Sequence, residues 1–140
     1  MSAEYSSLDP LVGTFTGEGR WVDIAGDSKP YRIRQSTTRE GNRLVVRYAH
    51  EFFEEGNTIA GEIEFDFVSG SIFSVRMKGA HMGHGYLFQP YLHFNLKVGE
   101  IFVETSYELG ASGLQVRGSS TSNAQGRFIA WHETLAKSSS

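Results

Sequence analysis

The sequence has no cysteine and no long apolar run, and these two absences exclude several classes of protein. Without cysteine there is no disulfide framework, no thiolate nucleophile and no cysteine-ligated metal. No apolar run approaches the roughly 20 residues of a membrane-spanning helix. The first ten residues lack the basic region and apolar run of a signal peptide. We therefore expect a cytoplasmic protein without a membrane span, since a chain free of cysteine fits a reducing compartment.

The chain also lacks a strong charge of either sign. Lys and Arg number 13 and Asp and Glu number 16, which gives a formal net charge of −3. This balance argues against a nucleic acid partner, which would favour a basic surface. At 140 residues the chain is expected to form one domain over 1–140. Its ends, 1–10 and 137–140, are predicted to be flexible or to cap the domain.

Proline is scarce, whereas glycine and aromatic residues are abundant, and this composition is typical of an all-β domain. There are 3 Pro, 16 Gly, 10 Phe and 6 Tyr. Clusters of Gly, Asn, Asp and Ser separate runs rich in Val, Ile, Thr and aromatics. The runs predict about nine strands, at 12–22, 31–39, 43–53, 58–67, 71–78, 86–96, 100–108, 114–121 and 127–136, with a break at Pro90 as the alternative for 86–96. One short helical turn is predicted within 3–10.

The length and order of these strands favour a closed antiparallel up-and-down β-barrel of about eight to ten strands. Long strands in simple meander order leave two exposed edges unless the sheet closes on itself. A β-sandwich is the alternative, although its strands are usually shorter and linked by Greek-key crossings.

The first predicted strand places its glycines on one face. Gly13, Gly17 and Gly19 share that face with two aromatic residues, Phe15 and Trp21. Such glycines allow a strand to coil sharply and leave room inside a barrel. A bulged strand with no cavity behind it is the alternative interpretation.

This stretch resembles the first strand of the calycin superfamily, which contains the lipocalins and the nitrobindin-like bacterial proteins. The nitrobindin-like pattern is Gly-Thr-Trp-x-Gly-x-Gly, and here it reads Gly13, Thr14, Phe15, Gly17 and Gly19, with Phe in place of Trp. The resemblance implies a lipocalin-like barrel with an internal ligand. It also implies haem binding through a histidine near the C-terminus, which in this chain would be His132.

The leading functional prediction is a binding protein for a small, largely apolar or aromatic molecule inside the barrel, with no cofactor. Aromatic and aliphatic side chains would supply contact area, and a few polar groups would orient the ligand. The residues predicted to contact the ligand are Phe15, Gly17, Trp21, Tyr31, Gln35, Phe65, Tyr91 and Tyr107.

The alternative is a cofactor-independent enzyme of the isomerase, cyclase, dehydratase or decarboxylase class that uses the same cavity. His50, His93 and His132 are its candidate general acids or bases, with Tyr48 beside them. Each of these side chains could equally be a half-buried residue with a hydrogen-bonded tip.

Two further features bear on metals and partners. His81 and His84 are three residues apart, so on a regular strand they would face opposite sides; the flanking glycines instead favour a loop at the barrel mouth. No third ligand lies nearby in the sequence, so no metal site is predicted. Phe53, Phe73 and Trp131 are expected on an edge or on the outer face, where they would allow a homodimer without requiring one. A solidly packed barrel that works by associating with another chain is the remaining alternative.

Overall fold

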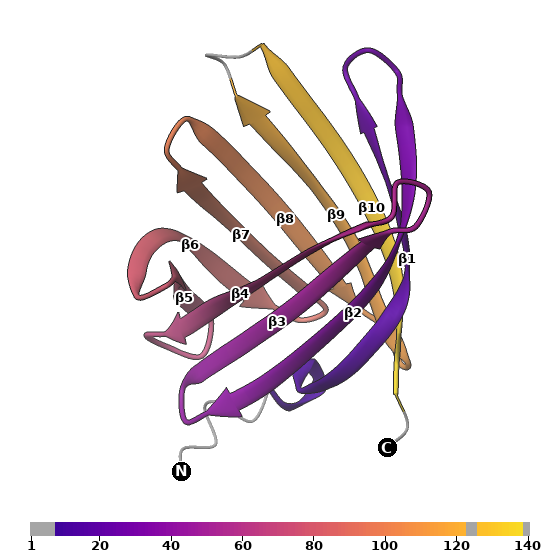
Figure 1. The fold of residues 1–140 in the computed structure, drawn as a ribbon. Coiled ribbons are helices and arrows are strands. Elements are labelled where there is room, and N and C mark those ends of the chain that lie inside the picture. The colour runs from indigo at the N-terminus through magenta and orange to yellow at the C-terminus, as the bar shows by residue number, and fades with distance from the viewer. Residues whose placement is uncertain (1–7, 123–125, 139–140) are drawn as a thin grey trace.

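The chain folds into a closed antiparallel barrel of ten strands (Figure 1), seen in a computed structural model that describes residues 8–122 and 126–138. The strands are β1 (Gly13–Asp23), β2 (Ser28–Glu40), β3 (Arg43–Phe52), β4 (Asn57–Phe67), β5 (Ile72–Met77), β6 (Ala80–Phe88), β7 (Tyr91–Val98), β8 (Ile101–Leu109), β9 (Gly113–Ser122) and β10 (Arg127–Lys137). Each strand pairs with the next in sequence, and β1 pairs with β10. The predicted closed barrel is confirmed, and the sandwich alternative is wrong.

The barrel has one strand more than the nine that were predicted. The additional strand arises within residues 86–96, which were predicted as one strand or as a strand broken at Pro90. The break is confirmed, since β6 ends at Phe88 and β7 begins at Tyr91, with a turn at Gln89 and Pro90. The glycine-rich stretch around His81 and His84, which was predicted to be a loop, forms the first part of β6. Gly85 lies at an inward position. A side chain there would overlap the ring of Phe73, so glycine is the residue that fits. The glycines of this segment therefore serve close packing.

A short 3₁₀ turn at residues 8–11 closes one end of the barrel. Leu8 and Leu11 are buried and join the same apolar cluster as Phe15. Residues 1–7, which include most of the predicted helical turn, lie outside the described residues, as do 139–140. In the part of the chain that the structure describes, no helix is long and apolar enough to cross a membrane.

A phenylalanine cluster fills the barrel next to this closed end. The ring centroid of Phe73 lies 4.7 Å from that of Phe65 and 4.8 Å from that of Phe67. Phe73 is fully buried, and Trp131 points inward as well, so the prediction that both lie on an outer face is wrong. Phe53 is exposed, with the guanidinium of Arg32 4.5 Å from its ring centroid.

The inward glycines leave space that neighbouring groups fill. A Cβ on Gly19 would lie 2.8 Å from both the Tyr31 ring and the Glu133 side chain. A Cβ on Gly17 would overlap the backbone carbonyl of Thr134 on β10. The glycine face of β1 therefore seats a pair of polar side chains and lets β10 approach closely, rather than leaving an empty space.

This geometry predicts different costs for two glycine substitutions. Gly17→Ala should lower the free energy of unfolding by about 3 kcal/mol, because its Cβ meets a backbone atom that cannot move alone. Gly61→Ala should cost only about 1 kcal/mol, because its Cβ meets the movable end of the Tyr48 side chain. Urea unfolding of both variants measures the difference. Equal losses would contradict this account of Gly17.

The β5–β6 hairpin is too short to complete the wall. β4 pairs with β3 over residues 57–66, but with β5 only over Glu64–Phe67. On the other side of the hairpin, the β6–β7 pairing ends at Gly83 and Leu96. The wall is therefore lower between β4 and β7, at the barrel end opposite the 3₁₀ turn.

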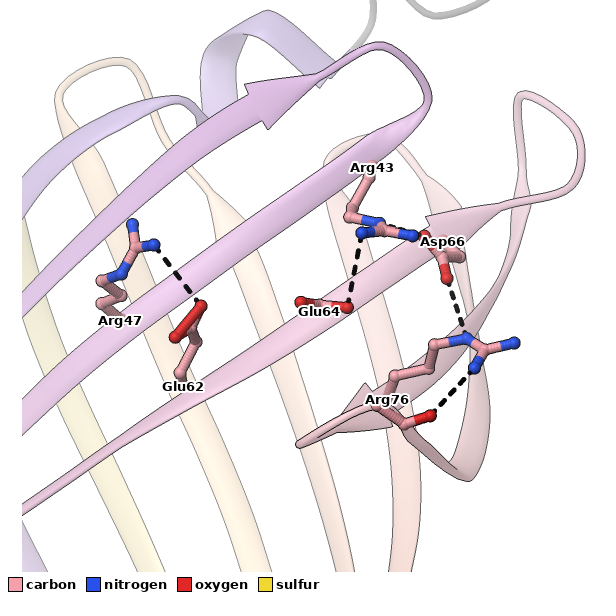
Figure 2. Close-up of polar contacts among 7 residues, drawn as sticks. Arg43, Arg47, Glu62, Glu64, Asp66 and Arg76 are labelled. Atoms are coloured by element: carbon pink, nitrogen blue, oxygen red, sulfur yellow. Dashed lines mark hydrogen bonds and ion pairs between the residues drawn. The ribbon is translucent and has the colours of Figure 1, made fainter.

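Ion pairs on the outer surface reinforce the short β4–β5 junction (Figure 2). Asp66 on β4 lies 2.7 Å from Arg43 Nε on β3 and 3.0 Å from Arg76 Nε on β5. Arg47 and Glu62 form a further contact of 3.5 Å on the same outer face. The arginines of these strands thus lie outside the barrel and leave the interior to uncharged and acidic groups.

Candidate functional site

An interior cavity of about 350 Å³ lies at the end of the barrel where the wall is low. Its aliphatic lining comes mainly from β4, β5, β7 and β8, which contribute Ile63, Met77, Leu96, Val98, Ile101 and Val103. Val98 and Ile101, which flank the β7–β8 turn, are partly exposed at the rim. The cavity is therefore open to solvent at the end of the barrel where the β5–β6 hairpin leaves the wall low.

A second hollow, of about 560 Å³, lies on the outer wall around the β8–β9 turn and the adjoining parts of β1 and β10. Its lining includes Gly17, which was predicted to contact a ligand inside the barrel. None of its described lining residues is a buried polar side chain. The interior cavity is the better candidate site because it combines apolar walls with buried polar groups.

A buried carboxyl group, Glu133 on β10, is the centre of those polar groups. Glu133 is 4% exposed, and the hydroxyl of Tyr31 on β2 donates a hydrogen bond of 2.8 Å to its Oε2. His50 Nε2 on β3 lies 3.9 Å from the same oxygen. The imidazole ring also stacks on the Tyr31 ring, with centroids 5.0 Å apart. Two consecutive strands near the start of the chain, β2 and β3, thus bring side chains to a carboxyl group on the last strand.

The surroundings change the titration of these groups. Burial raises the pKa of Glu133 to about 7, although the hydrogen bond from Tyr31 opposes this rise. Burial lowers the pKa of His50 to about 4, so its imidazole is neutral at pH 7 and its approach to Glu133 is not an ion pair there. Burial also raises the pKa values of Tyr31, Tyr48 and Tyr107, whose phenols stay protonated. Glu133 is therefore the group in this cluster that changes charge near neutral pH.

Four of the predicted site residues line the cavity: Gln35, Tyr48, His50 and Tyr107. Tyr31 lies beside them and reaches the site through its hydrogen bond to Glu133. On β3, whose two faces are equally apolar in the sequence, Tyr48 and His50 point inward as predicted. Their predicted part in ligand binding or catalysis stays a prediction.

Three other predicted ligand contacts lie away from the cavity. Phe15 and Phe65 are sealed in the apolar core. Trp21 packs against the core and pairs across β1 and β10 with Trp131, and only Trp131 lines the cavity. The sequence pattern gives the face of a residue but not its depth along the barrel, which explains these errors.

Three candidates lie on the outer face, so the prediction that they line the cavity is wrong. Tyr91 is 54% exposed, and the Nδ1 atom of His93 lies 2.7 Å from the hydroxyl of Ser106. The inward residues of β7 are instead the apolar Leu92, Phe94 and Leu96. His132 is exposed and lies opposite Arg20 and Arg117 in the strand pairing. A haem inside the barrel could not take its axial ligand from His132.

Glu133 is the site residue that sequence reasoning missed. The two faces of β10 are Phe128, Ala130, His132 and Thr134 on one side, and Ile129, Trp131, Glu133 and Leu135 on the other. The choice of His132 as a candidate site residue placed the first face inside. The available signal was the larger apolar content of the second face, which places its single acidic residue in the interior.

His81 and His84 both lie on the outer face of β6, although regular alternation would separate them. Val75 pairs with Gly83 and Arg76 pairs with His81, so Met82 is an extra residue in a β-bulge. The two imidazole rings lie 4.7 Å apart as a result. Within residues 8–122 and 126–138, no group of three or more His, Cys, Asp or Glu side chains is arranged to hold a metal ion.

Comparisons with known proteins find likeness in structure alone. No family model matches the sequence, and no curated protein matches it. The structure of Rv2717c from M. tuberculosis has a TM-score of 0.76 at 12% identity and covers 99% of each chain.

Two further solved structures have similar folds. The S-type phycobiliprotein lyase CPES from Guillardia theta has a TM-score of 0.78 at 11% identity, covering 100% of this chain and 94% of the other. A DUF3598 protein of unknown function from Nostoc punctiforme has a TM-score of 0.70 at 14% identity, covering 94% of this chain and 49% of the other. At these identities the likeness shows that the chain shares an antiparallel β-barrel fold with these proteins.

Proposed function

We propose that this barrel binds a small, largely apolar molecule in its interior cavity and admits it beside the short β5–β6 hairpin. The observation that carries the proposal is an apolar cavity into which Gln35, Tyr48 and Glu133 bring polar groups from three strands. Apolar walls with a few convergent polar groups are the usual composition of a small-molecule site.

The comparisons support this proposal in a general way. The neighbour from Guillardia theta is named a phycobiliprotein lyase, and this supports a small-molecule role for a barrel of the same shape. The cavity of about 350 Å³ is at the small end of the usual range for ligand sites. We therefore propose a ligand smaller than a tetrapyrrole such as haem or a bilin. A relationship to the calycin superfamily, based on the pattern from Gly13 to Gly19, is part of the same proposal.

A second candidate function is acid–base catalysis in the same cavity. The observation that favours it is the pKa of Glu133, which is raised to about 7 and so suits a group that accepts and returns a proton near neutral pH. Tyr31 would hold the carboxyl in place through its hydrogen bond. His50, with its pKa lowered to about 4, suits an acid role at neutral pH less well. The acid–base role that was predicted for histidine thus moves to Glu133.

Filling the cavity should abolish binding. Val103 lines the cavity and is only partly buried, so Val103→Phe adds volume where a ligand would lie. We expect at least about tenfold weaker binding of a neutral solvatochromic dye, because the added ring displaces the dye from its apolar contacts. Dye fluorescence titration measures this effect.

The matched control is Val22→Phe, which makes the same change at an exposed position on the outer face. It should leave the dye affinity unchanged. Unchanged dye binding in a folded Val103→Phe variant would refute the cavity proposal.

For the enzyme candidate, Glu133→Gln should abolish turnover while keeping the affinity for a neutral ligand within about tenfold, since an acid–base group acts mainly on the barrier.

A further inference from the structure

The side chains that line the cavity are unbalanced in charge. Glu133 is the one acidic side chain among its described lining residues, and no Lys or Arg joins it there. The arginines of the adjacent β3, β4 and β5 wall, Arg43, Arg47 and Arg76, form their ion pairs on the outer face (Figure 2). A ligand entering this cavity therefore meets a buried carboxyl group without a compensating positive side chain.

We infer that the ligand of this cavity is an organic cation, a small apolar molecule carrying an ammonium group that pairs with Glu133 among aromatic rings. The inference rests on the proposed function and names the ligand class. A carboxylate ligand such as a fatty acid would place a second negative charge beside Glu133. A purely apolar ligand would leave the ionised carboxyl group with the Tyr31 hydrogen bond but no counter-charge, which is unfavourable for a buried charge.

The aromatic lining supports a cation in particular. Tyr48, Phe94, Tyr107 and Trp131 all contribute to the cavity wall. The Phe94 and Tyr107 rings meet edge to face with centroids 6.0 Å apart. Aromatic faces attract ammonium groups, and the attraction is larger in a site shielded from water. A carboxyl group beside several aromatic rings is thus suited to an ammonium ion on both counts.

Proton binding to Glu133 makes the affinity for a cation depend on pH. The titratable groups that face Glu133 are Tyr31 from β2, Tyr48 and His50 from β3, and Tyr107 from β8. The inward residues beside it on β1 and β9, Gly19 and Val116, are not titratable. Above pH 5 the three phenols and the imidazole stay uncharged, so Glu133 alone sets the dependence.

Three probes of similar size test the inference: 2-phenylethylamine, 2-phenylethanol and phenylacetate. Isothermal titration calorimetry at pH 8 should show the amine binding at least about tenfold more tightly than the alcohol, and phenylacetate binding most weakly. Between pH 8 and pH 5 the amine should lose on the order of 100-fold in affinity, because Glu133, with its pKa near 7, becomes protonated. The affinity for the alcohol should stay nearly constant.

Two variants assign the effect to Glu133. Glu133→Gln keeps the shape of the side chain but removes its charge, so it should eliminate both the preference for the amine and its pH dependence. Glu18→Gln makes the same change at an exposed position on β1 and should preserve both. Far-ultraviolet circular dichroism confirms that each variant is folded.

The outcomes separate this inference from the proposal on which it rests. Equal binding of the amine and the alcohol, or an amine preference that persists in Glu133→Gln, would overturn the cation inference and leave the cavity proposal standing. If none of the three probes bound and Val103→Phe left dye binding intact, both would be wrong.

Discussion

Replacing Glu133 with glutamine should stabilise the fold on the order of 3 kcal/mol above pH 8 and have little effect at pH 4. Burial raises the pKa of this carboxyl from an ordinary value near 4.5 to about 7. Between these two values the folded chain holds a proton that the unfolded chain has released. The stability of the native protein therefore falls as pH rises through this window, by about 1.4 kcal/mol for each pH unit. Glutamine stays neutral, accepts the Tyr31 hydrogen bond and removes this loss.

The measurement is urea unfolding of both proteins at several pH values from 4 to 9. The difference between the two curves isolates Glu133, because every other titrating group is common to both. Glu18→Gln serves as the control, since Glu18 is exposed on the outer face of β1. A constant difference between pH 4 and pH 9 would mean that Glu133 titrates normally and that burial does not raise its pKa.

Phe73→Ala should cause the largest loss of stability, about 3–5 kcal/mol. Phe73 is fully buried, its ring lies 4.7 Å from that of Phe65 and 4.8 Å from that of Phe67, and it covers Gly85. Removing the ring takes away its apolar transfer energy and leaves a cavity that the surrounding β-sheet cannot collapse to fill. Since a single domain is stable by only about 5–15 kcal/mol, we expect a marginally folded protein.

The control for this variant is Phe88→Ala on the outer face of the neighbouring strand β6, where the side chain is exposed. It should change the free energy of unfolding by less than about 1 kcal/mol. Thermal and urea unfolding should rank the two variants in the same order. If Phe73→Ala were as mild as Phe88→Ala, the phenylalanine cluster would not be the main core.

The wall of the barrel could be predicted from local patterns. In β4 the residues Ile63, Phe65 and Phe67 alternate with acidic ones, so one face is clearly apolar, and the structure buries that face. The same holds for Tyr31, Ile33 and Gln35 on β2, which alternate with arginines. Such strands show their inner face because only one of their two faces can enter an apolar core.

For β7 and β10 the wrong face was predicted to line the cavity. On β10 both faces mix apolar and polar residues, and on β7 one face is apolar and the other polar. On both strands the histidine-bearing face was predicted to line the cavity, which placed His93 and His132 inside. Both lie outside. The apolar content of the opposite faces, with Phe94 on β7 and Leu135 on β10, was the better guide, because burial follows the apolar area of a whole face.

The sequence alone therefore determined that this chain is an all-β protein, that its strands run antiparallel in order, and which face of its clearest strands is buried. Only the tertiary structure decided which inward residues meet a cavity and which are sealed in the core. It also brought Tyr31 against Glu133, 102 residues further along the chain, in the space left by Gly19. The physical reason is that alternation and turn signals act between neighbours in sequence, whereas burial of a carboxyl group depends on strands that meet only when the barrel closes.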